Sequence, residues 1–391
     1  MASFSSSNGE EDQVLVEDKS FVRTVILNRP KRLNAASYHM ISRLWELFLV
    51  YEKDPYVKLV ILKGKGRAFC AGGDVAAVVH DINNGNWKSS ASVFRKEYRL
   101  FYLMATYCKP QVSILNGIVM GAGAGFSIHG SFRVATENSV FAMPETALGL
   151  FPDIGSSYFL SRLPGHFGEY LGLTGARLDG AEMLACGLAT HFVPSVELLS
   201  LEAALHSVDS SDQAIISAVI GEYSELPMLE KQSAYNRLDV INRCFSRRTV
   251  EDILYALISS MSLLQEQEAT NEVDDWIQAS LQSLKKASPI SLKISLRSIR
   301  EGRLQGVGQC LVREHRIDCH AMRGEVSKDF VEGCRAVILD KDRNPKWEPP
   351  RLGLVTDKMV DIYFSKVDDE DWEELKLPPR PNLPASAFAK L

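Results

Sequence analysis

The 391-residue sequence lacks several patterns that would point to a particular chemistry. Its seven cysteines form no C-x-x-C pair and no zinc-type cluster with histidine, so we expect free thiols in a reducing compartment and no metal site. The glycines at 121, 123 and 125 do not have the G-x-G-x-x-G spacing of a dinucleotide-binding turn, and no G-x-S-x-G elbow is present. A nucleotide-dependent oxidoreductase and a serine hydrolase of these kinds are therefore not expected.

The sequence also has no strong excess of charge and no long uninterrupted apolar run. A net charge of −5 gives no reason to expect a nucleic acid or an anionic membrane as a partner. The most apolar long window, residues 112–130, is interrupted by Asn116 and His129 and contains five glycines. It therefore predicts a buried strand and helix rather than a membrane span. Residues 1–12 lack the apolar core of a signal peptide and the arginines of a transit peptide.

The last three residues, Ala389-Lys390-Leu391, form a small–basic–leucine ending of the peroxisomal type. The proline-rich segment before it, residues 377–384, is expected to be extended and to leave this tripeptide exposed. The sequence thus predicts a peroxisomal location, with the peroxisomal import receptor as a partner. Residues 367–374 form an acidic run, which is expected to be a solvated tail.

Hydrophobic periodicity predicts an α/β core followed by a mainly helical region. Strands are expected at residues 14–17, 22–27, 57–63, 110–118, 132–135 and 140–142, and helices at 37–51, from 74, at 94–107 and at 289–300. Ser288 followed by Pro289 is typical of a helix start. Residues 260–273 are polar and suggest a flexible insertion. We predict three parts: an active-site core of stacked ββα units at 1–207, a helical domain at 208–350 and a tail at 351–391.

Residues 66–153 concentrate the features that suggest catalysis. Glycine-rich turns at 72–73 and 121–125 each follow an apolar run and precede a helical pattern. Glu145 and Asp153 lie in apolar loops with neighbouring prolines. Backbone N–H groups at two such turns can converge on one oxyanion, with a carboxylate beside it to act on a reacting atom. Each turn taken singly is also explained by tight strand–helix packing.

These segments resemble the crotonase (enoyl-CoA hydratase/isomerase) superfamily. Residues 68–74 are similar to its first oxyanion loop and residues 116–125 to its second, and the similarity extends over about residues 14–350. Within the superfamily, the sequence resembles the 3-hydroxyisobutyryl-CoA hydrolases, and with its Ala-Lys-Leu ending a plant peroxisomal member. Supporting segments are residues 94–98, 132–137, 141–146, 149–153, 173–175, 189–193, 328–333 and 344–347. The resemblance implies a spiral of ββα units with a mainly helical C-terminal region.

The resemblance also assigns roles to individual residues. It implies that the backbone N–H groups of Gly73 and Ala122 are the oxyanion donors and that Glu145 is the catalytic acid. Asp153 and Glu97 would contact the acyl group, its hydroxyl or the attacking water. Ala71 and Asp74 would border the bound substrate. Ala122 departs from the glycine usual at this position, and its Cβ would crowd the thioester or restrict φ.

Other interpretations of these residues stay open in the sequence. Glu145 could be a structural or helix-capping acid, Asp153 an N-cap, and Glu97 part of a solvated helix face. Cys70 beside the first turn could be a nucleophile, although a small buried packing residue is favoured because no histidine has an evident pairing role.

Gly125 separates two reactions that the resemblance allows. Hydratases of the superfamily have a second glutamate at this position, so its replacement by glycine favours thioester hydrolysis over addition of water to a C=C bond. The expected reaction converts 3-hydroxyisobutyryl-CoA to 3-hydroxyisobutyrate and CoA in valine breakdown, with 3-hydroxypropionyl-CoA as a further candidate substrate. Glu145 could activate water or form an anhydride with the acyl group. The alternatives are an enoyl-CoA hydratase or isomerase and a silent CoA-binding subunit. No cofactor is expected, and a homo-oligomer is compatible with the sequence.

Overall fold

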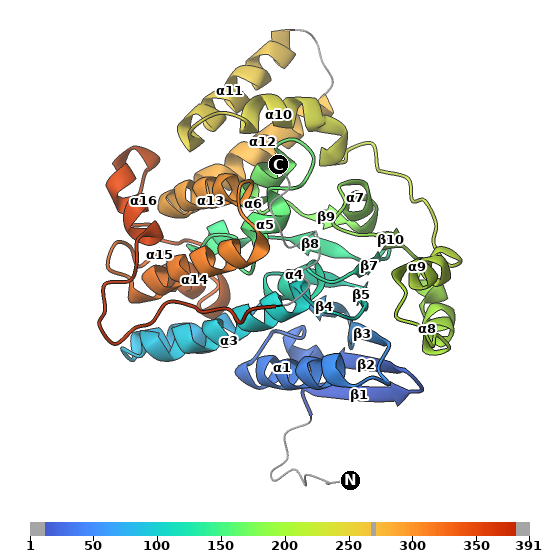
Figure 1. Cartoon of the computed structure of the whole chain (residues 1–391). Coiled ribbons are helices and arrows are strands. Elements are labelled where there is room, and N and C mark those ends of the chain that lie inside the picture. The colour runs from blue at the N-terminus through green and yellow to red at the C-terminus, as the bar shows by residue number, and fades with distance from the viewer. Residues whose placement is uncertain (1–11, 267–270, 381–391) are drawn as a thin grey trace.

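The computed structural model describes residues 12–266 and 271–380 and has an α/β core of two sheets (Figure 1). The six-stranded sheet has the order β1-β2-β3-β5-β7-β10 and the four-stranded sheet has the order β4-β6-β8-β9. Pairing is parallel except between β1 and β2 and between β8 and β9. The strands are β1 (Val14–Lys19), β2 (Val22–Leu27), β3 (Leu59–Gly64), β4 (Ala68–Cys70), β5 (Gln111–Leu115), β6 (Ile118–Met120), β7 (Phe132–Ala135), β8 (Val140–Ala142), β9 (Leu178–Asp179) and β10 (His191–Phe192). The predicted α/β core is confirmed.

Consecutive strands of the core pass from one sheet to the other. β3 and β4, β5 and β6, and β7 and β8 each place their first strand in the larger sheet and their second in the smaller one. The prediction of a single strand at residues 110–118 is therefore wrong, because the chain turns at Gly117 between β5 and β6. Gly117 has φ +110, and a Cβ there would lie 2.3 Å from the carbonyl oxygen of Arg67, so the turn requires glycine.

Three helices of the core were predicted from local sequence signals, and two of them begin within one residue of the predicted position. Helix α1 (Tyr38–Lys53) begins after Ser37, whose hydroxyl accepts a hydrogen bond from the Met40 N–H. Helix α2 (Val75–Asn83) begins after Asp74, as predicted. Helix α3 (Trp87–Ala105) starts seven residues earlier than the predicted 94, because its apolar face already begins with Ala91 in the core.

The remaining core helices are short or lie on the outer face of the larger sheet. They are α4 (Ala122–Ser127), α5 (Ser156–Leu160), α6 (Phe167–Thr174), α7 (Gly180–Ala185), α8 (Leu198–His206) and α9 (Gln213–Gly221). Leu201 of α8 and Ile216 of α9 belong to one apolar cluster with Leu59 of β3, so both helices cover the same sheet. The boundary predicted after residue 207 falls between these two helices, and the three-part division stays a prediction.

Beyond α9 the described residues form helices and loops. The helices are α10 (Leu238–Phe245), α11 (Val250–Glu266), α12 (Asn271–Lys286), α13 (Pro289–Gly302), α14 (Val307–Arg323), α15 (Asp329–Cys334) and α16 (Asp357–Phe364). The Ser288 cap is confirmed by a hydrogen bond from the Ser291 N–H to its hydroxyl. The flexible insertion expected at 260–273 is wrong for 260–266 and 271–273, which continue α11 and α12, because Leu257 and Ile277 of these helices are buried. Residues 267–270 lie outside the described part.

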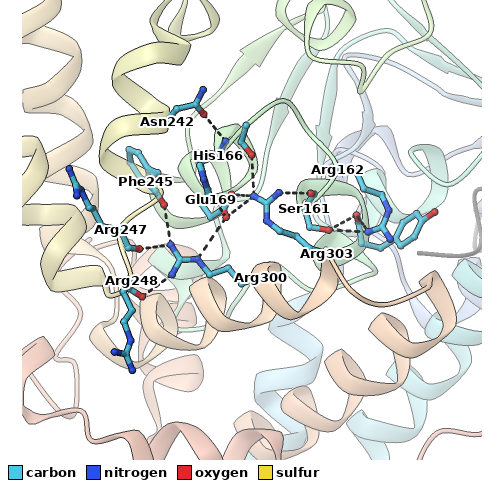
Figure 2. A network of polar contacts seen from close by, with 12 residues as sticks. Ser161, Arg162, His166, Glu169, Asn242, Phe245, Arg247, Arg248, Arg300 and Arg303 are labelled. Atoms are coloured by element: carbon cyan, nitrogen blue, oxygen red, sulfur yellow. Dashed lines mark hydrogen bonds and ion pairs between the residues drawn. The ribbon is translucent and has the colours of Figure 1, made fainter. Parts of the chain in front are cut away.

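A buried ion-pair network fastens α6 to α13 (Figure 2). The Glu169 side chain is completely buried, and both of its oxygens accept hydrogen bonds from Nη2 of Arg303, at 2.7 and 2.8 Å. His166 Nδ1 lies 3.1 Å from the same carboxylate. Burial by itself would raise the pKa of Glu169, but the hydrogen bonds from His166 and Arg303 hold it below its ordinary value. The core and the helical region are therefore joined by a fully partnered charge.

The acidic segment 367–374 packs against the body of the protein, so the prediction of a solvated tail is wrong. The Trp372 ring lies 5.1 Å from that of Trp87, and the Arg95 guanidinium lies 4.2 Å from the centre of the Trp372 ring. Asp369 pairs with Lys88 at 2.8 Å. These aromatic and cation–π contacts offset the charge of the run. The segment runs beside α3 (Figure 1), and the tripeptide 389–391 lies outside the described residues.

No helix in the described ranges is long and apolar enough to cross a bilayer.

Candidate functional site

Most of the predicted site residues surround one cavity of about 130 Å³ between the two glycine turns. Its lining includes Ala71, Gly73, Glu97, Ala122, Glu145 and Asp153. Asp74 lines a neighbouring cavity of about 170 Å³. The two cavities share Gly73, Val75, Phe94 and Glu97 in their walls. Segments 80 residues apart in the sequence therefore meet here, as the sequence predicted, and together line a mostly apolar space.

Two backbone N–H groups at the cavity wall have the local geometry expected of free donors. A parallel bridge joins Ala36 to Gly73 and uses the carbonyl of Gly72 and the N–H of Asp74, so the Gly73 N–H takes no part in it. Ala122 is the first residue of α4, and the first N–H groups of a helix have no partner in an earlier turn. The preceding residue, Gly121, has φ +47, a backbone conformation that would be strained for a residue with a side chain.

Glu145 lies at the start of the 3-10 turn η2 (Glu145–Leu148) and is 6% exposed. A Cβ built on Gly121 would lie 3.4 Å from Oε1 of Glu145, so the carboxyl group is next to the second glycine turn. Its Oε2 is buried without a hydrogen-bond partner among the described residues. Burial, and then the negative charge of Asp153, raise the pKa of Glu145 well above its ordinary value.

Asp153 faces the same cavity from the loop before α5. Burial and the negative charge of Glu314 raise its pKa to about 8. The N-cap interpretation is not supported, because the N-cap residue of α5 is Gly155 and no side-chain capping bond is present. Since Glu145 and Asp153 repel each other's charge, the two carboxyls behave as a pair that retains a proton near neutral pH.

Glu97 is buried in the cavity wall and is not part of a solvated helix face. It is 5% exposed, and its Oε1 has no hydrogen-bond partner among the described residues. Burial, and then the charge of Asp153, raise its pKa to about 8. The basic neighbours Arg95 and Lys96 lie on other faces of the helix, where Arg95 contacts Trp372 and Lys96 contacts Ser42.

Three residues missed by the sequence analysis lie behind the cavity. Glu314 and Asp318 of α14 are completely buried, and the hydroxyl of Tyr98 donates a hydrogen bond of 2.6 Å to Asp318. A signal was present: Glu314 and Asp318 lie at i+3 and i+7 from Leu311, on the helix face that the apolar pattern assigns to the core. Acids on an apolar face indicate partners or a functional site.

Cys70 is a packing residue rather than a nucleophile. It is fully buried, and burial raises the pKa of its thiol to about 12. Its Sγ donates to the Gly72 carbonyl, and a Cβ on Gly123 would lie 2.2 Å from the Cys70 carbonyl oxygen. The thiol therefore has little thiolate character near neutral pH.

Gly125 is enclosed by the core and does not line the cavity. A Cβ at this position would lie 2.5 Å from a ring carbon of Phe101 in α3. A second carboxylate at residue 125 therefore cannot be accommodated unless Phe101 moves. The expectation that this position carries no acid toward the substrate is consistent with this packing.

The helical region completes the cavity. Phe330 of α15 and Ile338 line it together with the core residues. A Cβ on Gly333 would lie 2.3 Å from the backbone of Leu148, so α15 packs directly against the turn that carries Glu145. No three His, Cys, Asp or Glu side chains within 12–266 and 271–380 are arranged to bind a metal ion.

Comparison with known proteins agrees with this architecture. Residues 22–364 match the enoyl-CoA hydratase/isomerase family. The chain is 69% identical to 3-hydroxyisobutyryl-CoA hydrolase 1 of Arabidopsis thaliana, over 97% of this chain and 98% of that protein. It is 45% identical to the small ribosomal subunit protein mS47 of the same plant, over 97% of this chain and 91% of that protein. The solved structure of a carnitinyl-CoA dehydratase from Mycobacterium thermoresistibile is 33% identical and superposes with a TM-score of 0.82, covering 94% of this chain and 99% of that one. The chain belongs to the enoyl-CoA hydratase/isomerase family of the crotonase superfamily.

Proposed function

We propose that this protein hydrolyses the thioester of 3-hydroxyisobutyryl-CoA to 3-hydroxyisobutyrate and CoA, a step of valine breakdown. The observation that carries the proposal is the pair Glu145 and Asp153, buried in one cavity beside the N–H groups of Gly73 and Ala122. The 69% identical plant relative bears the name of this hydrolase. A cavity with two carboxyls, two candidate oxyanion donors and an apolar wall suits an acyl thioester.

The proposed chemistry begins with attack on the thioester carbonyl carbon. Negative charge moves to the carbonyl oxygen, where the N–H groups of Gly73 and Ala122 stabilise it, and loss of one such donor typically costs about 2.7–4 kcal/mol of barrier. The ionised member of the Glu145–Asp153 pair accepts the proton of the attacking water. The protonated member donates a hydrogen bond to the acyl hydroxyl or to the departing sulfur. The tetrahedral adduct then expels CoA.

A covalent route is a variant of the same proposal. Here the carboxylate of Glu145 attacks the carbonyl carbon, CoA leaves, and water resolves the resulting anhydride. Single-turnover hydrolysis in ¹⁸O-water tests for the covalent route. Transfer of label to the Glu145 carboxyl supports the anhydride, because hydrolysis of the anhydride at the enzyme carbonyl leaves water oxygen there. Label found in the released acid alone is the outcome of direct attack by water, and also of an anhydride that water opens at the acyl carbonyl.

Two alternatives from other functional classes are tested by the same substrate panel. A hydratase or isomerase would change the absorbance of crotonyl-CoA, and the Phe101 ring against Gly125 argues against it. The ribosomal relative suggests a catalytically silent subunit as the second alternative, and such a subunit would release no thiol from the CoA esters. We expect thiol release from 3-hydroxyisobutyryl-CoA, less from 3-hydroxypropionyl-CoA and least from acetyl-CoA. Turnover of crotonyl-CoA alone, or none at all, would overturn the proposal.

The remaining features of the proposal concern the environment of the enzyme. The reaction needs no metal or redox cofactor, and CoA enters as part of the substrate. We expect import into peroxisomes through Ala389-Lys390-Leu391, which a fluorescent fusion lacking these three residues would test. A homo-oligomer is compatible with the sequence, and light scattering on the purified chain measures the oligomeric state.

A further inference from the structure

Glu314 of α14 is bonded to the backbone that follows Asp153. Its Oε2 accepts a hydrogen bond from the N–H of Gly155. Its Oε1 accepts a hydrogen bond of 2.9 Å from the N–H of Ser157 and a further bond from the Ser157 hydroxyl. Three donors from two residues of the α5 turn therefore converge on one buried carboxyl group that lies more than 150 residues away in the sequence.

The donor pattern favours the ionised form of Glu314: burial raises its pKa, while the bonds from Ser157 and Gly155 and the charge of Arg313 act in the opposite direction. Two of its partners are backbone N–H groups, which can only donate. The third is the Ser157 hydroxyl, which accepts a hydrogen bond of 2.8 Å from Nη2 of Arg313 and so directs its own proton toward Glu314. Arg313 also donates to the Ser298 carbonyl, which fixes its orientation. Glu314 is therefore an ordered acid with both oxygens partnered rather than a spare buried one.

The backbone between Asp153 and Gly155 needs such support. Ile154 has φ +59, a left-handed conformation that is an outlier for a β-branched residue and costs of order 1–3 kcal/mol. Its carbonyl contacts Nε2 of His129 at 3.0 Å, and its N–H donates weakly to the Tyr98 hydroxyl at 3.4 Å. Gly155, the next residue, also has φ +83. The bonds to Glu314 hold the turn in this strained form.

We propose that Glu314 is a positioning residue for Asp153, which it sets in the cavity through the hydrogen bonds that it accepts from Gly155 and Ser157. The inference rests on the proposed function, because it gives Glu314 a role in the same thioester hydrolysis. It also gives the helical region a direct part in the chemistry, since α14 supplies the anchor for a residue of the core.

The charge of Glu314 has a second effect on Asp153. The titratable groups that act on the Asp153 carboxyl come from three directions: Glu97 and Tyr98 from α3, Glu145 from η2, and Glu314 and Asp318 from α14. Of these, Glu314 is the charge that raises the pKa of Asp153 beyond the effect of burial. Burial and the charge of Asp153 raise the pKa of Asp318 well above its ordinary value.

The test compares Glu314→Gln with Glu169→Gln, a buried glutamate of equal exposure that is bonded to Arg303 and lies outside the cavity. In protein labelled with ¹³C at aspartate carboxyls, the Asp153 signal is assigned by its loss in Asp153→Asn. We expect Glu314→Gln to lower the titration midpoint of Asp153 by about one pH unit or more, because a nearby like charge is removed. Glu169→Gln lowers the melting temperature and leaves this midpoint in place.

Kinetics supply the functional readout. The alkaline limb of kcat/KM for 3-hydroxyisobutyryl-CoA should move to lower pH in Glu314→Gln by the same shift, with kcat reduced more than KM is changed. Should Glu314→Gln not fold, Ser157→Ala removes one donor to Glu314, favours its neutral form and shifts the midpoint in the same direction by less. An unchanged Asp153 midpoint in the folded variants overturns the inference. A shifted midpoint in a protein that releases no thiol overturns the proposed function and leaves the positioning role in place.

Discussion

Two carboxyl oxygens in the cavity are buried without a hydrogen-bond partner among the described residues. They are Oε1 of Glu97 and Oε2 of Glu145. An unsatisfied buried polar atom costs about 1–3 kcal/mol, and such a cost is usually retained only where a ligand or reaction uses the atom. The apolar wall around them keeps these acids in their neutral form to higher pH than in water. The residues are thus placed for proton transfer rather than for stability.

At Glu145, replacement by glutamine keeps the shape of the side chain and removes its ability to accept a proton. We expect Glu145→Gln to lower kcat for thioester hydrolysis by about 10²- to 10⁴-fold, the usual contribution of a general base. Binding of the thioester, measured by calorimetry, should remain. Cys70→Ala is the matched control, since the thiol is buried and has a pKa of about 12, and it should retain nearly full activity. A fully active Glu145→Gln enzyme would break the assignment.

At Gly125, the prediction concerns packing and reaction type together. A Cβ would lie 2.5 Å from the Phe101 ring, so we expect Gly125→Ala to lower the free energy of unfolding by about 1–3 kcal/mol. Gly125→Glu should gain no crotonyl-CoA hydration, because the cavity is not on this side of α4. Adding Phe101→Leu, which shortens the opposing side chain, should restore part of the stability. Equal stability of Gly125→Ala and the wild type in urea unfolding would contradict the close packing.

Local signals predicted the elements well where one residue decides the geometry. The cap at Ser288 and the strands β7 and β8 were predictable, because hydroxyl caps and alternating apolar runs act over a few residues. The split of β5 and β6 was not, because both strands are apolar and only the contact of Gly117 with Arg67 forces the turn. Glu145 and Asp153 were candidates from their apolar loops, and the resemblance supplied their roles. Glu314 was found only in the fold, since no sequence motif joins it to Asp153.

At the element scale, α15 supports the turn that carries Glu145. A Cβ on Gly333 would lie 2.3 Å from the backbone of Leu148. We expect Gly333→Ala to displace η2 and to reduce kcat at least 10-fold, because displacements near 1 Å at a catalytic group have costs of this order or larger. Gly221→Ala is the control, since a Cβ there meets nothing within 4 Å. Unchanged kcat in Gly333→Ala would show that η2 does not depend on this contact.

At the scale of the whole molecule, the core and the helical region share one cavity. The core supplies the glycine turns and three acids, α15 supplies Phe330, and Glu314 of α14 binds the backbone that follows Asp153. The Glu169 network joins the same two regions at a second place (Figure 2). The cavity acids have raised pKa values, whereas the pKa of Glu169 is lowered. The contributions of these two places to stability therefore depend on pH in opposite directions.

This opposition can be measured with two matched variants. The pKa of Glu97 is raised from 4.5 to about 8, so the folded protein keeps a proton that the unfolded chain releases. Its stabilising contribution is fully present below pH 4.5 and is lost as pH rises through about 8, at about 1.4 kcal/mol per pH unit. The melting-temperature difference between the wild type and Glu97→Gln should therefore change steadily across this window in the direction that disfavours the wild type at high pH. The pKa of Glu169 is lowered in the folded protein. The melting-temperature difference between the wild type and Glu169→Gln should therefore stay constant from pH 5 to 8 and decrease only in acid. A flat difference for Glu97→Gln would mean that Glu97 is ionised in the folded protein, and would remove the argument that the cavity acids hold protons near neutral pH.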